Sequence, residues 1–317
     1  MTSNSYAVEL NALDISQYRR GNTGIDYATT FDSGAPGAHV MLSALVHGNE
    51  LCGAHALDYL LREEVRPQQG KLTLAFMNIA AYARFDPANP VVSRYVDEDF
   101  NRVWSAEVLD GPRDSVELRR AREVRPLVDT VDLLLDIHSM QHATPPLMLA
   151  GRHDKGRRLA LGVGAPVHVV CDAGHAAGTR MRDYAAFGDR DSERNALLIE
   201  CGQHWASGTD RVAVEVALRF LACTGSVARE WVEARLPATA PPAQRIIDVT
   251  GPVTIESDRF RFVEDYQGME VIADEGTVIG WDGERTVRTP YPNCVLIMPS
   301  RRLRRGESAV RFGRYID

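Results

Sequence analysis

The sequence of 317 residues contains very little lysine. Lys71 and Lys155 are the only two lysines, so arginine supplies the remaining 34 of the 36 basic residues, and the net charge is −7. The short run RRLRR, residues 301–305, is the one local cluster of basic residues, and we expect it to be an exposed turn. Because no dense basic block occurs, the composition gives no indication of nucleic-acid binding.

Long apolar runs are absent as well. No stretch of about 18 or more apolar residues occurs, which argues against a membrane span. The N-terminal stretch MTSNSYAVEL lacks a basic segment followed by an apolar core, so we expect no signal peptide and a cytoplasmic location. The five cysteines are odd in number and widely spaced, without a CxxC motif. They therefore indicate reduced thiols rather than a disulfide framework or a cysteine-type zinc site.

The first two thirds of the chain alternate between apolar, strand-like runs and helical patterns. Strands are predicted at 39–46, 71–79, 131–138, 146–151, 167–172 and 195–202. Helices are predicted at 50–65, 115–128 and 207–233. Such an alternation is typical of an α/β fold, so we predict a mixed, largely parallel sheet flanked by helices.

A change of composition divides the chain after this region. The stretch RLPATAPPAQ, residues 235–244, holds three prolines and three alanines and is typical of a linker. Beyond it, short β-type runs are separated by Gly, Pro and Asp. We therefore predict an α/β domain over residues 1–235 and a smaller β-rich C-terminal domain over residues 236–317.

Residues suited to metal chemistry stand where three predicted strands end. His47 and His138 close two of them, Glu200 closes a third, and Glu50 lies three residues after His47 where a helix begins. The carboxyl ends of parallel strands meet at one edge of a sheet, so we expect these side chains to lie close together. Two imidazoles and one carboxylate form a known catalytic zinc set that leaves a fourth position for water. Glu200 is then the candidate carboxylate for proton transfer.

Other polar residues near these positions have simpler interpretations. A histidine at a strand end is more often a hydrogen-bonded structural residue, and only the combination of three strand ends favours a metal. By helix periodicity His55 faces a different direction from Glu50 and is expected to pack, while His142 and His204 are not predicted to be ligands. Alternation turns Asp136 to the same side of its strand as His138, where it is either a hydrogen-bond partner of a ligand or a polar residue near a sheet edge.

Four segments, taken together and in order, resemble a known family. These are VHGNELCG, SRYVDEDFNRVW (93–104), LLDIHSM (134–140) and LLIECGQH (197–204). They look like the signature blocks of the succinylglutamate desuccinylase/aspartoacylase family, within the wider zinc-carboxypeptidase superfamily. The resemblance covers roughly residues 40–235. It implies a zinc-carboxypeptidase-like α/β domain, a C-terminal β domain that caps the active site, and one Zn²⁺ per chain.

The resemblance also implies roles for individual residues. By position, the zinc ligands match His47, Glu50 and His138, and the general base matches Glu200. The arginine that polarises the scissile carbonyl matches Arg94.

Substrate-binding residues follow from the same resemblance. Asn101 and Arg102 match the pair that binds the carboxylate of the amino-acid product, and Tyr291 matches a tyrosine that the tail contributes to the substrate pocket. A planar guanidinium suits that role because it binds a carboxylate at two points. A further substrate-contacting arginine is expected shortly before the general base, and the alternatives are Arg180, Arg182, Arg190 and Arg194.

The implied activity is hydrolysis of the amide bond of an N-acyl amino acid or a close analogue, a small-molecule substrate. A metallocarboxypeptidase acting on short peptides would use the same residues, but it needs an open groove where the tail is expected to close over the cleft. A binding module that keeps zinc without catalysis is the third alternative, and the position of Glu200 argues against it. The acyl group, the amino acid and the oligomeric state stay open, a homo-oligomer being one option.

Overall fold

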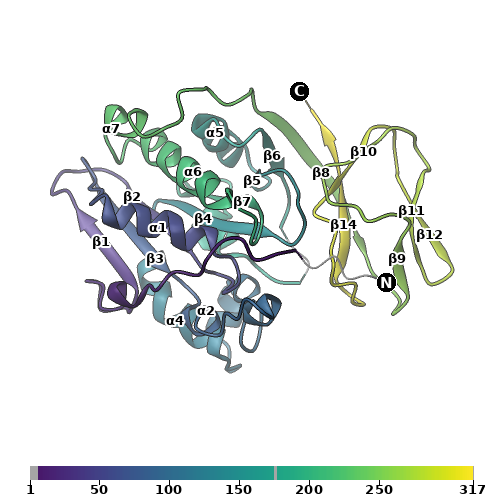
Figure 1. Cartoon of the computed structure of the whole chain (residues 1–317), viewed down its shortest axis with the longest axis horizontal. Helices are drawn as coiled ribbons and strands as arrows, with labels where there is room; N and C mark the ends of the chain where they lie inside the picture. The colour runs from purple at the N-terminus through teal and green to yellow at the C-terminus, as the bar shows by residue number, and fades with distance from the viewer. Residues whose placement is uncertain (1–5, 175–176, 317) are drawn as a thin grey trace.

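One large sheet forms the centre of the structure (Figure 1). The computed structural model describes residues 6–174 and 177–316, so the first half of the N-terminal stretch considered above lies outside the described residues. The sheet has eleven strands in the order β1-β3-β2-β4-β7-β5-β6-β8-β14-β13-β10. Their bounds are β1 Ala28–Asp32, β2 His39–Ala44, β3 Lys71–Phe76, β4 Leu133–Met140, β5 Leu147–Leu149, β6 His168–Cys171, β7 Asn195–Gln203, β8 Arg245–Thr254, β10 Val271–Ile272, β13 Cys294–Ile297 and β14 Ser308–Tyr315.

The helices are mostly short, and in the sequence they alternate with these strands. Their bounds are α1 Cys52–Arg62, α2 Ile79–Tyr82, α3 Ala106–Leu109, α4 Val116–Val128, α5 Asp154–Val163, α6 Thr209–Cys223 and α7 Arg229–Glu233. In the described part of the chain, none of them has the length and apolar character that a bilayer crossing requires.

Both faces of the central sheet bury apolar side chains, and helices cover each face. Val40, Leu42 and Ala44 of β2 belong to a core that includes residues of α1, α5 and α6. Met41 points to the opposite face, into a second core that includes residues of α4. The pairs β2–β3, β2–β4, β4–β7, β5–β6 and β6–β8 are parallel. The predicted α/β fold with a mixed sheet flanked by helices is therefore confirmed.

The predicted long helix over 207–233 is wrong in one respect, because it is two helices. α6 ends at Cys223 and α7 begins at Arg229. Gly225 lies between them with a φ of +68°, a left-handed conformation that ends a helix. The apolar periodicity continues across this break, which is why the sequence pattern did not reveal it.

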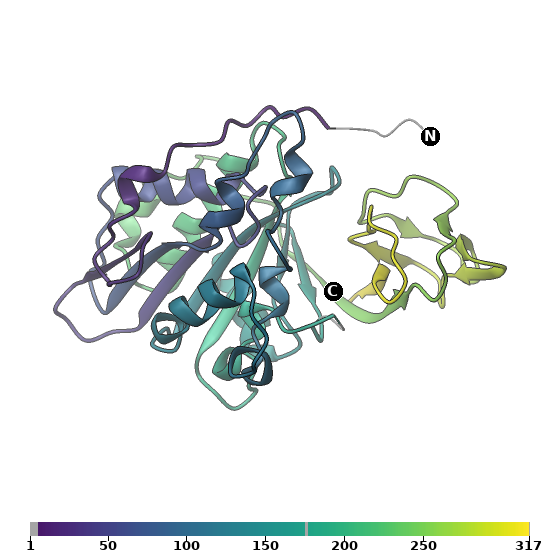
Figure 2. The same ribbon diagram turned by 90° about the horizontal axis from the view of Figure 1, so that it is seen from below.

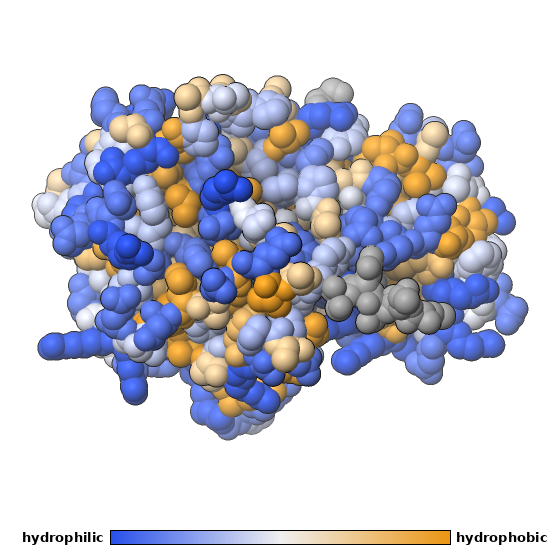
Figure 3. Space-filling view, viewed as in Figure 1, coloured by the Kyte–Doolittle hydropathy of each residue, from blue (hydrophilic) through white to orange (hydrophobic). Residues whose placement is uncertain are grey.

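The β-rich C-terminal segment, residues 245–316, lies beside the α/β part of the molecule (Figure 2). Its first strand, β8, pairs in parallel with β6, so this segment continues the main sheet. The strands β9 Phe260–Phe262, β11 Val278–Asp282 and β12 Arg285–Arg288 form a second, antiparallel sheet. On the face shown in Figure 3, hydrophobic side chains form small areas scattered among hydrophilic ones. The division into two domains stays a prediction, since the large sheet runs through both.

Candidate functional site

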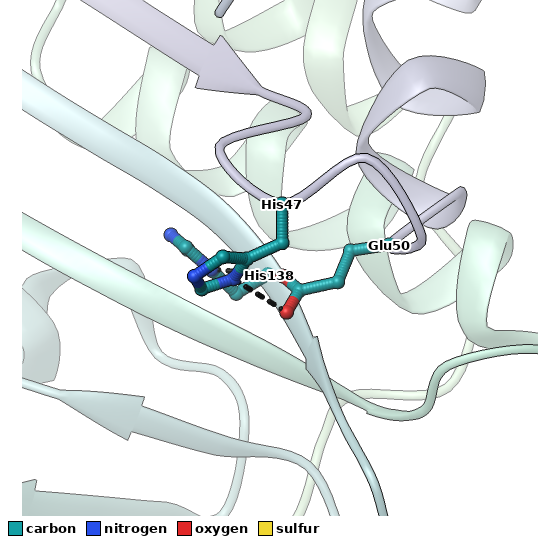
Figure 4. A group of neighbouring side chains, drawn as sticks. All are labelled: His47, Glu50 and His138. Carbon is teal, nitrogen blue, oxygen red and sulfur yellow. Dashed lines mark hydrogen bonds and ion pairs between the residues drawn. The ribbon is translucent and has the colours of Figure 1, made fainter. Parts of the chain in front are cut away.

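Three side chains from two neighbouring strand ends converge on one point (Figure 4). His47 and Glu50 lie in the turns between β2 and α1, and His138 lies near the end of β4. One potential ligand atom from each of them lies within 4.8 Å of the others, and all three side chains are buried. Among residues 6–174 and 177–316, this is the one group of its kind that could hold a metal ion.

The geometry of the group places Glu50 between the two imidazoles. Nδ1 of His47 lies 2.7 Å from Oε1 of Glu50, and Nδ1 of His138 lies 2.8 Å from Oε2. Burial opposes the ionisation of Glu50, but the two imidazoles lower its pKa well below the usual range. The two Nδ1 atoms and the carboxylate therefore face a common centre.

Gly48, between His47 and Glu50, allows neighbouring backbone segments to approach closely. A Cβ at this position would lie 2.4 Å from backbone atoms of Ala81, Tyr82 and Ser93, far inside van der Waals contact. Its N–H donates to the carbonyl oxygen of Arg94 at 3.1 Å. The absence of a side chain at Gly48 thus lets the segment that carries Arg94 approach the three candidate ligands directly.

The second nitrogen of each imidazole has a carboxylate partner. Nε2 of His138 lies 2.8 Å from Oδ2 of Asp136, whose other oxygen accepts a hydrogen bond from Ser43 at 2.7 Å. Nε2 of His47 lies 2.8 Å from Oδ1 of Asp99. Of the two alternatives predicted for Asp136, the structure shows the first, in which Asp136 is a hydrogen-bond partner of a candidate ligand. Such partners fix the tautomer and orientation of metal-binding imidazoles.

Glu200 lies on β7, directly opposite His138 in the parallel register of β4 and β7. Its side chain is buried and lines the same cavity as the three candidate ligands. Within the described residues, Oε2 of Glu200 has no hydrogen-bond partner. Burial, with a smaller contribution from the charge of Glu50, raises the pKa of Glu200 to about 8. A buried carboxyl group with one free oxygen is suited to exchange a proton with a bound molecule.

Arg94 lies against the candidate ligands themselves. Its Nη2 is 3.0 Å from Nε2 of His47 and 3.2 Å from Oδ2 of Asp99, and its Nη1 is 3.3 Å from Oε1 of Glu50. It follows directly after the 3₁₀ turn Pro90–Ser93, which the contact at Gly48 holds in place. A cation is thereby fixed at the edge of the candidate metal site.

Asn101 and Arg102 lie in a second 3₁₀ turn, Phe100–Arg102, and both line the cavity. Oδ1 of Asn101 accepts a hydrogen bond from the backbone N–H of Met181 at 2.8 Å. Nη1 of Arg102 donates to the carbonyl oxygen of Asn101 at 2.7 Å. Burial and the charges of Arg94, Arg180 and Arg311 lower the pKa of Arg102, which marks a region of excess positive charge.

Tyr291 is not brought to this cavity, in contrast to the other predicted site residues. Its hydroxyl forms a 2.5 Å hydrogen bond with Oγ1 of Thr250, and the guanidinium of Arg314 stacks on its ring at 3.8 Å. The residues that line the cavity do not include it. The substrate-pocket role of Tyr291 stays a prediction, and in the structure the tyrosine packs within the C-terminal segment, where β8 and β14 supply its partners.

Among the four candidate arginines before Glu200, only Arg180 lines the cavity. Arg182 is buried and donates to the carbonyl oxygens of Ala196 and Ala150. Arg190 is exposed, and Arg194 donates to the carbonyl oxygen of Asp129. Nε2 of His55 forms a hydrogen bond with the carbonyl oxygen of Asn11, away from the cavity, whereas His142 and His204 are among the residues that line it.

Sequence reasoning missed three arginines that the C-terminal segment contributes. Arg302, Arg304 and Arg311 line the cavity, which has a volume of about 270 Å³. The run RRLRR was expected to be a plain exposed turn, but two of its arginines lie at the cavity while Arg301 and Arg305 are exposed. The unusual density of arginine in this run was the available signal, whereas nothing in the pattern of β14 singles out Arg311.

Comparisons with known proteins agree with the resemblance seen in the sequence. Residues 36–219 match the family model of the succinylglutamate desuccinylase/aspartoacylase catalytic domain. An N-acyl-aromatic-L-amino acid amidohydrolase (carboxylate-forming) from Rattus norvegicus is 28% identical over 113 residues, which are 33% of this chain and 34% of that protein. The chain thus spans about a third of the length of such curated relatives.

Solved structures extend the similarity of the fold to most of the chain. The succinylglutamate desuccinylase from Vibrio cholerae has a TM-score of 0.69 at 16% identity, covering 92% of this chain and 86% of that one. Murine aminoacylase 3 has a TM-score of 0.57 at 19% identity, covering 89% of this chain and 96% of that one. The C-terminal β segment is therefore part of the shared fold.

Proposed function

The chain belongs to the succinylglutamate desuccinylase/aspartoacylase family, and we propose from this premise that it is a zinc-dependent hydrolase that cleaves the amide bond of an N-acyl amino acid. The observation that carries the proposal is the convergence of His47, Glu50 and His138 at a cavity that is also lined by Glu200, the neighbour of His138 on the adjacent strand. A metal-binding group beside a carboxyl group with a free oxygen is the minimum that such a hydrolysis requires.

The chemistry of the donor set fits zinc. Two imidazole nitrogens and one carboxylate are borderline and hard donors that Zn²⁺ accepts in catalytic sites, and three protein ligands leave a position open. The carboxylate partners Asp136 and Asp99 support both imidazoles in the manner that metal-binding histidines require. A zinc ion held there would polarise an amide carbonyl and lower the pKa of a neighbouring water molecule toward ~7.

The protein groups around this position account for the movement of protons and charge. Glu200 accepts a proton from the attacking water and returns it to the nitrogen of the leaving amine. Burial raises the pKa of Glu200, which favours a carboxyl group that holds the proton until it returns it to the leaving amine. Arg94 donates to the carbonyl oxygen as that oxygen becomes negatively charged.

Substrate binding falls to Asn101 and Arg102. The guanidinium of Arg102 binds the α-carboxylate of the amino-acid portion. Asn101 positions this carboxylate, because the side chain of Asn101 is itself fixed by the N–H of Met181. The cavity volume of about 270 Å³ favours a small substrate over a peptide chain, and residues of the C-terminal segment form part of its wall. We propose that this segment acts as a cap that limits the substrate to N-acyl amino acids.

The test is a panel of N-acetyl and N-succinyl amino acids, assayed with dipeptides for comparison. We expect turnover of N-acyl amino acids that a chelator abolishes and Zn²⁺ restores, with metal content measured in parallel. Faster cleavage of dipeptides would instead indicate a metallocarboxypeptidase and would contradict the proposed cap.

The Glu200→Gln variant separates catalysis from metal binding. We expect kcat to fall by about 10²–10⁴-fold, the usual contribution of a general acid–base, while the bound zinc per chain stays unchanged. Glu233→Gln is the matched control, because Glu233 is an exposed residue of α7 that pairs with Arg229 at 4.0 Å. Full activity of Glu200→Gln would refute its role in proton transfer.

A further inference from the structure

His204 is a buried residue of the cavity lining that has no role in the proposed reaction. It follows β7 directly, is 2% exposed and lines the same cavity as the candidate ligands. Nδ1 of its ring lies 2.8 Å from Oγ of Ser139. Within residues 6–174 and 177–316, the other ring nitrogen, Nε2, is buried and has no hydrogen-bond partner. A buried polar atom without a partner is costly, so this nitrogen points to a partner that a bound molecule supplies.

The surroundings hold the imidazole of His204 in a fixed place. The backbone N–H of His204 donates to the carbonyl oxygen of Met140 at 2.8 Å. The next residue, Trp205, donates through Nε1 to the carbonyl oxygen of Asn49 at 3.1 Å, and its ring lies 5.6 Å from that of His204. His204 is therefore anchored both to the end of β4 and to the turn before α1. Its free nitrogen has a defined position before a substrate binds, as recognition of a particular atom requires.

The imidazole of His204 is neutral. Burial lowers the pKa of His204 to about 3, although the charge of Glu50 acts in the opposite direction. A neutral imidazole carries one proton, and the partner of one nitrogen decides which nitrogen bears it. When Ser139 donates its hydroxyl proton to Nδ1, the proton of the ring lies on Nε2. Nε2 is then a hydrogen-bond donor without an acceptor.

His204 and Arg102 mark different ends of the cavity. Arg102 lies near Arg180 and Arg311, whose charges lower its pKa. These two arginines pair with Asp172, directly after β6. His204 lies instead by the end of β4 and the turn before α1. In the sheet, β4 and β6 are on opposite sides of β7, so the two ends of the cavity are separated across the sheet.

This arrangement determines which part of the substrate approaches His204. A substrate with its α-carboxylate at Arg102 and its scissile carbonyl at the candidate ligands extends its acyl group away from Arg102. Met140 and His142 line the cavity with His204, and all three side chains are buried. The acyl group therefore enters the part of the cavity in which Nε2 of His204 lacks an acceptor.

We propose that His204 is a specificity-determining residue whose Nε2–H donates a hydrogen bond to an oxygen atom of the acyl chain, beyond the scissile carbonyl. The inference rests on the proposed function and deepens it by specifying the acyl group. Because the imidazole is neutral, this oxygen needs no charge, and an ether, keto or amide oxygen is sufficient. A plain alkyl chain of the same length leaves the buried donor unsatisfied and is therefore a poorer substrate.

The test uses pairs of uncharged acyl groups of equal length, so that attraction by the arginines of the cavity is the same for both members. Methoxyacetyl is paired with butanoyl, and levulinoyl with isohexanoyl, each on the amino acid that is turned over fastest in the panel described above. Wild type, His204→Phe, His204→Gln, Ser139→Ala and His55→Gln are assayed, with zinc content measured in each. His55 is the control histidine because it lies on α1 and binds the carbonyl oxygen of Asn11, away from the cavity.

We expect wild type to prefer the oxygen-bearing member of each pair about tenfold in kcat/KM, as for one hydrogen bond. His204→Phe should abolish this preference because its ring has no donor, whereas His204→Gln should keep most of it because its amide nitrogen is a donor with a similar reach. Ser139→Ala should weaken the preference, since Nδ1 loses the partner that orients the ring, and His55→Gln should behave as wild type. The ratio within a pair is unaffected by a general loss of folded protein.

The position of the ring proton gives a measurement that does not depend on turnover. Nitrogen NMR of histidine-labelled protein, with His204→Gln identifying the signal, should show a neutral ring with its proton on Nε2. Equal kcat/KM for the two members of each pair in wild type, an unchanged preference in His204→Phe, or a proton on Nδ1 would each overturn the inference and leave the proposed function intact. If wild type with zinc bound hydrolyses no N-acyl amino acid at all, the proposed function itself fails, so the two failures are distinguishable.

Discussion

At the scale of single residues, Asp172 is the carboxylate that holds the basic wall of the cavity together. It lies directly after β6, is buried, and pairs with Arg180 at 2.7 Å and with Arg311 at 3.5 Å. Burial would raise the pKa of Asp172, but the charges of Arg180 and Arg311 lower it well below its usual range. The carboxylate is therefore ionised throughout the pH range in which the protein is expected to work.

This pairing predicts a pH-dependent loss of stability in Asp172→Asn. A carboxyl group whose pKa is lowered by folding contributes stability that is present above its unfolded pKa and is lost as the pH falls through the folded pKa. We expect the variant to lose about 3–5 kcal/mol at pH 7, because two buried guanidinium groups lose a partner, and the difference to shrink below about pH 4. Urea unfolding across this pH range measures it.

The control for that prediction is Asp248→Asn. Asp248 pairs with Arg157 at 3.3 Å, but its side chain is 45% exposed, so the loss should stay below about 1 kcal/mol. Equal losses in the two variants, or a loss in Asp172→Asn that does not depend on pH, would contradict the assignment.

Single residues also mark where sequence reasoning succeeds and where it ends. The positions of His47, His138 and Glu200 could be predicted because each follows an apolar strand, and parallel strands deliver their carboxyl ends to one edge. Arg311 could not, because it comes from an antiparallel strand far along the chain and only the packing of β14 against the rest brings it to the cavity. The role predicted for Tyr291 rests on the resemblance alone, and in the structure its partners lie in β8 and β14.

At the scale of elements, the turn between β2 and α1 determines how the site is assembled. It contributes two of the three candidate ligands, and through Gly48 it also contacts the 3₁₀ turn that precedes Arg94. Leu45 enters this turn with a φ of +60°, a conformation that non-glycine residues rarely adopt. A short, tightly packed connection therefore holds the candidate metal ligands and Arg94 in one unit.

Gly48→Ala should disturb both parts of that unit. Because the added methyl group would lie 2.4 Å from the backbone of residues 81, 82 and 93, we expect a loss of about 1–3 kcal/mol in the free energy of unfolding, together with a lower kcat. Chemical unfolding and steady-state kinetics provide the two measurements. Gly251→Ala is the control, since a Cβ there meets nothing within 4 Å. A Gly48→Ala variant as stable and active as this control would show that the turn tolerates a side chain.

The elements themselves were predictable to different degrees. The buried strands β2, β3, β4 and β7 and the helices α1 and α4 follow from runs of apolar residues and from helical periodicity. The break between α6 and α7 did not follow, because Gly225 interrupts a pattern whose apolar spacing continues. The pairing of β8 with β6 also did not follow, since a proline-rich connection before β8 is equally typical of a linker to a separate unit.

At the scale of the whole molecule, the charge around the cavity is opposite in sign to the net charge of the chain. The chain carries −7, yet the lining of the cavity has six arginines against four acidic residues. Arg302 and Arg304 both come from the run RRLRR and belong to this lining, and Arg304 is exposed. The anionic substrate proposed above would thus be repelled weakly by the molecule as a whole and attracted to this cavity.

This contrast predicts that kcat/KM for an anionic N-acyl amino acid falls as salt is added. The attraction acts through solvent over several ångströms, and the Debye length shortens from about 30 Å at 0.01 M salt to about 3 Å at 1 M. We expect a fall in kcat/KM of roughly tenfold between these limits, with a smaller change in kcat, because the effect concerns the approach and binding of the substrate. Arg304→Gln should be slower than wild type at low salt and should equal it at high salt, since screening removes the contribution of that charge. Arg259→Gln removes another exposed arginine of the C-terminal segment that does not line the cavity, and this variant should follow the wild-type curve. Parallel curves for Arg304→Gln and wild type would mean that the basic run does not guide the substrate, and its two cavity arginines would then act only through direct contact.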